Sequence, residues 1–238
     1  MSLAKEEKDK KDKPKPRLLL AVDVETRGQD PERHGLVSIG LYGKEIGGSF
    51  QISKRINVLP SNWQHMERRC EEEFWNRFPD LLKELSKEAW EASYAITEFE
   101  CLIETLRDDY EVDLLSDNPS FDFAFLNHYL HKYRGGPSLA YKRDRTSKFQ
   151  LSYEGVWDID EWVRAEAIKK FGNKWITIVD KEAEKAIKST ATHYPEEDAK
   201  SIHDLALHRL DMCISSEGFE LPPSTSQKRK KASDDEKE

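Results

Sequence analysis

Apolar and polar positions alternate along the chain in a way that predicts strands first and helices later. Residues 18–25 form a compact, mostly apolar run that ends at Arg27-Gly28, which predicts a buried strand. Two more strands are expected over 36–42 and 49–58, because glycines mark turns between them. Their short spacing predicts three strands in antiparallel succession.

Helical periods follow the third strand. Apolar positions over 74–85 fall on one helical stripe, which Pro79 is expected to break or restart. Thr97 and Glu100 have the spacing of a capping box, and apolar residues over 99–106 continue from them on one face. A helix starting at about Thr97 is therefore predicted.

Strand and helix then alternate. A short strand is predicted over 111–116 and a helix over 119–133, with Asn118 as N-cap. A tryptophan-bearing helix is expected over 159–171, and a last helix from Pro195 to about Ser215. This order predicts an α/β domain with a mixed sheet.

The two ends differ in composition from the rest of the chain. Residues 1–16 and 218–238 are rich in charged and small polar residues, which predicts two disordered charged tails around one domain over 17–217. The run 228–231, Lys-Arg-Lys-Lys, has the composition of a nuclear import signal. Cytoplasm and nucleus both remain open.

Composition excludes several classes of protein. The 238 residues are 37% hydrophobic, enough for a core at this length, and no run approaches the roughly 18 apolar residues of a membrane span. The start of the chain lacks the apolar centre of a secretory signal. We therefore expect an intracellular protein with no membrane partner.

Net charge and cysteine content limit the kinds of ligand and metal site that are expected. A net charge of −8 argues against a generally basic surface that grips nucleic acid, but it allows a nuclease whose acids hold divalent cations. The three cysteines, Cys70, Cys101 and Cys213, are too far apart for a disulfide framework or a zinc site with close ligand pairs. They are expected to be reduced thiols in or near the core.

A few acids fall on faces that the periodicity assigns to the interior. Asp23 and Glu25 project to the same side of the first strand, where their charges repel unless a cation such as Mg²⁺ is bound. The alternative is that the strand is already ending and Glu25 is solvated. Asp122 shares its helix face with the apolar positions 125, 126, 129, 130 and 133, although an acid near a helix N-terminus is also favoured by the dipole.

The last helix carries a third such acid. Asp198 lies about 40° from Ile202 and about 20° from Leu205 around the helix, which predicts a position in the middle of its apolar stripe. His203 and His208 are expected at the surface.

Together these residues resemble the DEDDh family of 3′→5′ exonucleases, which includes oligoribonuclease, RNase T and the proofreading subunit of bacterial replicative polymerase. Asp23-Val24-Glu25-Thr26 resembles the first motif, Asn118-Pro119-Ser120-Phe121-Asp122 the second, and His193 followed by Asp198 the third. Three motifs in the family's order, each in its predicted strand or helix, are far more specific than one. The stretches before the second and third motifs look most similar to phage, plasmid and viral exoribonuclease-like proteins.

The resemblance implies a fold and a set of residue roles. The fold would be ribonuclease H-like, a five-stranded mixed sheet with helices on both sides. Asp23, Glu25, Asp122 and Asp198 would hold two Mg²⁺ or Mn²⁺ ions, with His193 as general base, a role that suits an imidazole. Glu25 would thus belong to both the metal site and the catalytic machinery. Thr26, Asn118 and Phe121 would contact the terminal nucleotide.

The implied reaction is stepwise hydrolysis of a single-stranded nucleic acid from its 3′ end to nucleoside 5′-monophosphates. RNA is slightly favoured over DNA, because the similar family members trim RNA. Many relatives are dimers, so a homodimer stays open. The alternative is a catalytically silent nucleic-acid-binding or scaffolding protein on the same fold, in which the charged tails are the functional part.

Overall fold

The computed structural model describes residues 15–60, 65–116, 118–135 and 192–213. The expected helix over 159–171 and the tail residues 1–14 and 218–238 lie outside the described residues. The structure also does not describe the side chains of His208 and Cys213, so their expected positions stay predictions.

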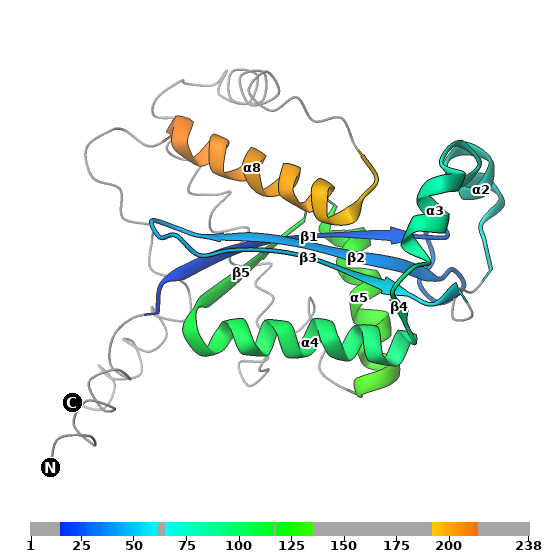
Figure 1. Ribbon diagram of the computed structural model, residues 1–238, viewed down its shortest axis with the longest axis horizontal. Coiled ribbons are helices and arrows are strands. Elements are labelled where there is room, and N and C mark those ends of the chain that lie inside the picture. The colour runs from blue at the N-terminus through cyan, green and yellow to red at the C-terminus, as the bar shows by residue number, and fades with distance from the viewer. Residues whose placement is uncertain (1–14, 61–64, 117, 136–191, 214–238) are drawn as a thin grey trace, which may run out of the picture.

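The described chain forms an open mixed sheet of five strands (Figure 1). The strands are β1 (Arg17–Thr26), β2 (Leu36–Glu45), β3 (Gln51–Val58), β4 (Ala89–Trp90) and β5 (Glu111–Leu115), in the spatial order β4-β3-β2-β1-β5. β1, β2 and β3 are antiparallel neighbours, whereas β5 runs parallel to β1 and β4 parallel to β3. The predicted antiparallel succession is confirmed. The sequence did not predict β4, because a strand of two residues is too short to show a periodic pattern.

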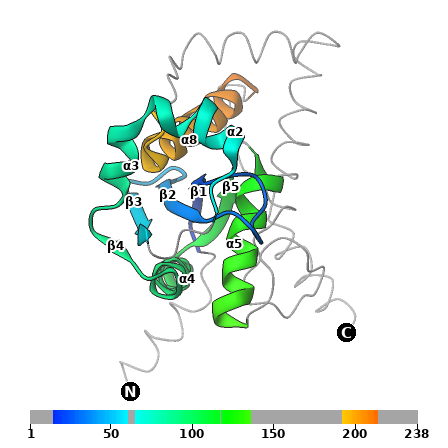
Figure 2. The same cartoon turned by 90° about the vertical axis from the view of Figure 1, so that its right-hand side faces the viewer.

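Helices cover both faces of the sheet (Figures 1 and 2). α4 (Ala92–Asp109) and α5 (Pro119–Arg134) lie on one face, and α8 (Pro195–Cys213) lies on the other. The short helices α2 (Arg68–Glu73), η2 (Trp75–Arg77) and α3 (Pro79–Leu85) gather at one end of the sheet, near the first turn of α8. The architecture is therefore α/β with helices on both sides, as predicted.

The main core lies between the sheet and the α4–α5 pair. Alternate residues of β1 point into it, so that Val22 and Val24 are buried there while Asp23 and Glu25 take the opposite side of the strand. The other contributors are apolar side chains of β2, β3, β5, α4 and α5. The predicted alternation in the first strand is confirmed.

Two helix starts test the local predictions. Pro79 opens α3 after the 3₁₀ turn η2, so the predicted break at this proline is confirmed. α4 begins at Ala92 rather than at Thr97, so the capping-box prediction is wrong, and the Thr97 hydroxyl instead donates to the carbonyl of Ser93 at 2.8 Å. The buried Ala92 and Ala95 extend the helix, but alanines add little to an apolar pattern.

α8 contacts the sheet through a stripe of small and polar residues. Pro195, Ala199 and His203 are buried, whereas Asp198 and Ile202 are only partly buried. The predicted surface position of His203 is therefore wrong, and Asp198 lies at the margin of the buried stripe rather than in its middle. The close approach of α8 to the strands determines which of its residues are buried, because small residues let the helix backbone lie against the sheet. Helical periodicity takes account only of apolar side chains and therefore misses this effect.

Two further expectations concern single residues and the membrane. Cys101 is exposed, so its predicted place near the core is wrong, and Cys70 is half-buried. No helix in the described ranges is long and apolar enough to cross a membrane.

Candidate active site

The site lies at the edge of the sheet where β1 extends beyond the end of its parallel neighbour β5. β5 ends at Leu115, opposite Ala21, while β1 continues to Thr26. Asp23 and Glu25 therefore lie in a stretch of β1 that β5 no longer pairs, and α5 begins just after β5 ends. Ligands of open α/β sheets commonly bind at such carboxyl ends.

An irregularity in the sheet lies at the same point. Glu25 pairs with Ser38, but Thr26 pairs with Leu36, so that β2 carries Val37 as an extra residue. A bulge of this kind bends a strand and redirects the side chains next to it. The bulge thus ends the regular ladder directly beside Glu25.

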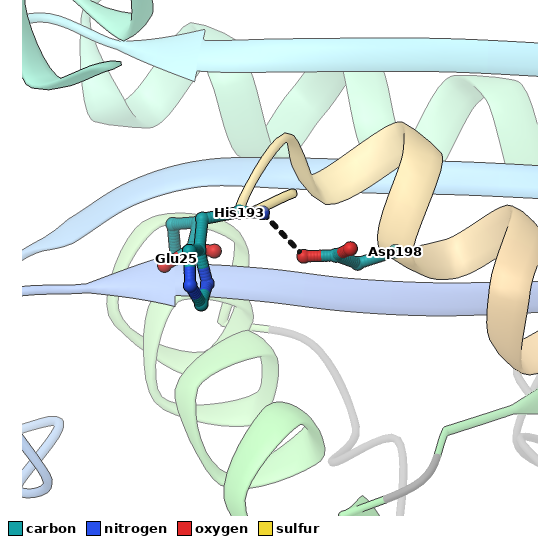
Figure 3. A group of neighbouring side chains, drawn as sticks. All are labelled: Glu25, His193 and Asp198. Atoms are coloured by element: carbon teal, nitrogen blue, oxygen red, sulfur yellow. Dashed lines mark hydrogen bonds between the residues drawn. The ribbon is translucent and has the colours of Figure 1, made fainter. Parts of the chain in front are cut away.

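The third motif forms a turn that leads into α8. The Asp198 carboxylate accepts hydrogen bonds from the backbone N–H groups of Thr192, at 3.0 Å, and of His193, at 2.8 Å; Figure 3 shows the bond from His193. His193 itself has a left-handed backbone with φ of 59°, which is uncommon for a residue with a side chain. Strained conformations of this kind persist only where surrounding contacts hold them, and here Asp198 supplies two such contacts.

The strand and the turn meet in a compact polar cluster. One ligand atom from each of Glu25, His193 and Asp198 lies within 4.8 Å of the others (Figure 3). Among the described residues, this is the group of acidic, histidine and cysteine side chains that is close enough to hold one metal ion. The structure therefore brings together three of the predicted site residues.

The fourth acid comes from the first turn of α5. Asp122 is only 2% exposed, which agrees with its predicted inward face. The Ser116 hydroxyl donates a hydrogen bond to the Asp122 carboxylate. The backbone N–H of Asp122 donates to the carbonyl of Asn118 at 3.0 Å. Ser116 thus ties the end of β5 to this acid.

The pKa of Glu25 responds to the charges of the three other acids, which shows that they lie near it. Burial raises the pKa of Glu25 well above its usual range, and the charges of Asp23, Asp198 and Asp122 raise it further. Asp23 and Asp122 lie outside the 4.8 Å group, yet they are close enough to act on Glu25. All four predicted acids therefore converge on one region.

Aromatic side chains surround the imidazole of His193. Its ring centroid lies 4.6 Å from that of Phe74, edge to face, and 4.6 Å from that of Phe78. Phe78 is 36% exposed, so this wall of the site reaches solvent. Sequence analysis assigned both phenylalanines to a helical stripe and gave no sign of the histidine contact, which joins residues more than one hundred positions apart.

The three residues predicted to contact substrate have different surroundings. Thr26 is buried; its hydroxyl donates to the carbonyl of Gly28 at 2.8 Å, and its own carbonyl accepts from the indole of Trp75 at 3.0 Å. Asn118 is the N-cap of α5 as predicted, is exposed, and makes no side-chain capping bond. Phe121 is half-buried against Phe125, with ring centroids 5.1 Å apart. Contact with substrate stays a prediction for all three.

Comparison with known proteins adds no relative to this picture. No protein-family model matches the sequence, and no curated protein is detectably similar to it.

Proposed function

We propose that the chain is a metal-dependent 3′→5′ exonuclease of the DEDDh type on a ribonuclease H-like fold. One observation carries the proposal: Asp23, Glu25, Asp122 and Asp198, from β1, α5 and α8, converge beside the imidazole of His193. Four acids gathered in a partly buried place repel one another, and a fold has no structural use for such an arrangement. The mixed sheet with helices on both faces is in keeping with the proposed fold.

The donor set fits Mg²⁺ or Mn²⁺. Both cations prefer oxygen ligands, and the cluster offers four carboxylates together with the imidazole of His193. Burial is the main cause of the raised pKa of Glu25, and the charges of the three other acids add to it; bound cations would relieve this repulsion. Asp23, Glu25, Asp122 and Asp198 would hold the ions. When bound, the ions would activate water and stabilise charge on the phosphate and the leaving oxygen.

The protein's own groups would carry out the rest of the reaction. A ring nitrogen of His193 would accept a proton from the attacking water, whose oxygen forms a bond to phosphorus. The bond from phosphorus to the 3′ oxygen of the preceding nucleotide then breaks, and that oxygen takes up a proton. The products are a nucleoside 5′-monophosphate and a chain shortened by one nucleotide.

The substrate proposed is the 3′ end of a single-stranded nucleic acid, with RNA slightly favoured over DNA. Asn118 is exposed next to Asp122, and Phe78 is partly exposed next to His193, so both are available to a terminal nucleotide. A cluster of acids would bind metal ions, which in turn bind phosphate, and it does not distinguish the sugars, because that distinction requires a contact to the 2′-hydroxyl.

The test is a time course on matched 5′-labelled single-stranded RNA and DNA with Mn²⁺ or Mg²⁺. The wild-type chain is compared with Asp122→Asn and with Asp80→Asn, which removes an exposed first-turn acid of α3. A ladder that shortens from the 3′ end, absent with EDTA and in Asp122→Asn but kept in Asp80→Asn, supports the proposal. Oligonucleotide binding without cleavage by the wild-type chain overturns it in favour of the binding or scaffolding protein.

A further inference from the structure

A row of three residues crosses the sheet beneath the first turn of α8. Asp23 of β1 pairs with Gly40 of β2, and Gly40 pairs with Arg55 of β3. Directly opposed residues of antiparallel strands project to the same face, so Arg55 lies on the α8 side with Asp23. Because Gly40 has no side chain, the backbone of Pro195 packs between the two.

Arg55 contacts the residues on either side of Pro195. Its Nη1 lies 3.2 Å from Oε1 of Glu196, and its guanidinium carbon lies 5.6 Å from the centre of the Tyr194 ring. A second carboxylate, that of Glu84 in α3, lies 4.0 Å from Nη2. One guanidinium therefore joins β3, α3 and the start of α8.

The contact to Glu196 is largely shielded from water. The side chains of Arg55 and Glu196 are 26% and 22% exposed, and the second carboxylate oxygen of Glu196 is buried without a hydrogen-bond partner among the described residues. Ion pairs are stronger in such surroundings than at the open surface. Removing Arg55 would leave the partly buried Glu196 charge without this partner.

We infer that Arg55 is a positioning residue, which fixes the turn carrying His193 and Asp198 against the sheet by binding Glu196 and Tyr194. The reaction that it would serve is the proposed exonuclease reaction, on which this inference rests. Tyr194 directly follows His193, and Glu196 lies between Tyr194 and Asp198, so the residues that Arg55 holds are interleaved with those of the site. The inference also gives a structural reason for Glu196, the acidic residue that directly follows Pro195.

The neighbouring residue of β3 supplies a matched control. Lys54 pairs with Glu98 of α4 at 3.2 Å, and their side chains are 43% and 49% exposed. Lys54 projects to the opposite face of the sheet, away from α8. Its loss removes a strand-to-helix ion pair without touching the turn.

The experiment compares full-length Arg55→Gln, Glu196→Gln, their double variant, Arg55→Lys and Lys54→Gln. kcat and KM are measured on a 5′-labelled single-stranded oligonucleotide with Mn²⁺. Hydrogen exchange reports on the amides of Thr192 and His193, which donate to Asp198. Circular dichroism checks that each variant is folded.

If Arg55 positions the turn, Arg55→Gln and Glu196→Gln lower kcat by about 10- to 100-fold, because small displacements of reacting groups are costly, while KM stays within about twofold. The double variant is no worse than either single one, since both remove the same contact. Arg55→Lys keeps the charge but not the planar guanidinium and recovers part of kcat. The two amides exchange faster in both glutamine variants, and Lys54→Gln resembles the wild type.

A kcat in folded Arg55→Gln equal to that of Lys54→Gln overturns the inference, as does a purely additive double variant. A wild-type chain without hydrolysis overturns the proposed function instead. In that event amide exchange still tests whether Arg55 holds the turn. Faster exchange of the Thr192 and His193 amides in Arg55→Gln supports the positioning of the turn, and unchanged exchange overturns it.

Discussion

Pro195 packs its backbone directly onto Gly40, where a Cβ atom would overlap both the carbonyl group of Pro195 and the amide of Glu196. The neighbouring atoms belong to backbone, so they cannot move aside as the end of a flexible side chain can. The start of α8, and with it Asp198, reaches the sheet only because position 40 is glycine.

Gly40→Ala is therefore expected to displace α8 and to destabilise the protein by about 1–3 kcal/mol, the usual range for overpacking. Urea denaturation measures the stability, and oligonucleotide hydrolysis measures the effect on the site. Gly48→Ala is the control, because its added methyl group meets only the carboxylate end of the flexible Glu45 side chain. Equal hydrolysis by folded Gly40→Ala and Gly48→Ala would contradict the expectation.

Glu25 gives the metal-free protein a pH dependence. Burial, then the charges of Asp23, Asp198 and Asp122, raise the pKa of Glu25 above the 4.5 of a free glutamate. Between pH 4.5 and its raised pKa the folded state holds a proton that the unfolded state has lost, so stability falls as pH rises through this window. Glu25→Gln, measured in EDTA by urea denaturation, is expected to be more stable than the wild type at neutral pH.

The difference between Glu25→Gln and the wild type is expected to disappear below pH 4.5, where both states of the wild type are protonated. Mn²⁺ should stabilise the wild type more than the variant, because the variant has lost one of the proposed ligands. A variant less stable than the wild type in EDTA at neutral pH would show that Glu25 is paired rather than repelled.

The indole of Trp75 ties the helical segment before α3 to the end of β1. Trp75→Phe removes the 3.0 Å hydrogen bond to the Thr26 carbonyl and is expected to cost about 0.5–1.5 kcal/mol of stability. Trp90→Phe, at a side chain 55% exposed, should stay within about 0.5 kcal/mol of the wild type. Chemical denaturation of the two variants compares them, and equal stabilities would mean that the bond contributes nothing.

His203 makes the docking of α8 sensitive to acid. Burial lowers the pKa of His203, the neighbouring Lys44 and Lys200 lower it further, and Asp204 opposes them. Below pH 6.5 the unfolded chain binds a proton that the folded chain resists, so stability falls as pH drops towards the lowered pKa. His203→Leu is expected to flatten this loss, as followed by thermal unfolding between pH 7 and 5.

His131→Leu is the control for His203→Leu, because His131 is exposed. Its pH profile should follow that of the wild type. If His203→Leu keeps the full acid dependence, another group is responsible for it.

His193 is expected to act on the chemical step. His193→Ala should lower kcat by about 10²- to 10⁴-fold, the usual contribution of a general base, with little change in KM. His131→Ala serves as the exposed-histidine control. Retained kcat in His193→Ala would exclude the imidazole as the base and leave it as a neighbour of the acids.

Local patterns predicted the acids well. Strand alternation assigned Asp23 and Glu25 to one face, and helical periodicity turned Asp122 inward, because each judgement needed only a few consecutive residues. The prediction for Asp198 missed the centre of the buried stripe by one residue, since the fit of Pro195 and Ala199 against the strands, rather than apolar area, decides how α8 is rotated.

Contacts between distant segments could not be predicted. Phe74 meets His193, and Arg55 meets Glu196, only after the sheet and helices have packed, and no spacing in the sequence encodes either pair. The buried His203 belongs to the same class, because its burial depends on how closely α8 approaches β2.

The order of the motifs along the chain sets when the acidic cluster can exist. Asp23 is made early, in β1, but Asp198 is supplied by α8, the last element of the described fold. During synthesis the growing chain can pair β1, β2, β3 and β5 and cover one face of the sheet well before residue 198 is added. The cluster of acids is therefore incomplete until residue 198 has been added and α8 has docked, and the proposed cleavage can begin only then.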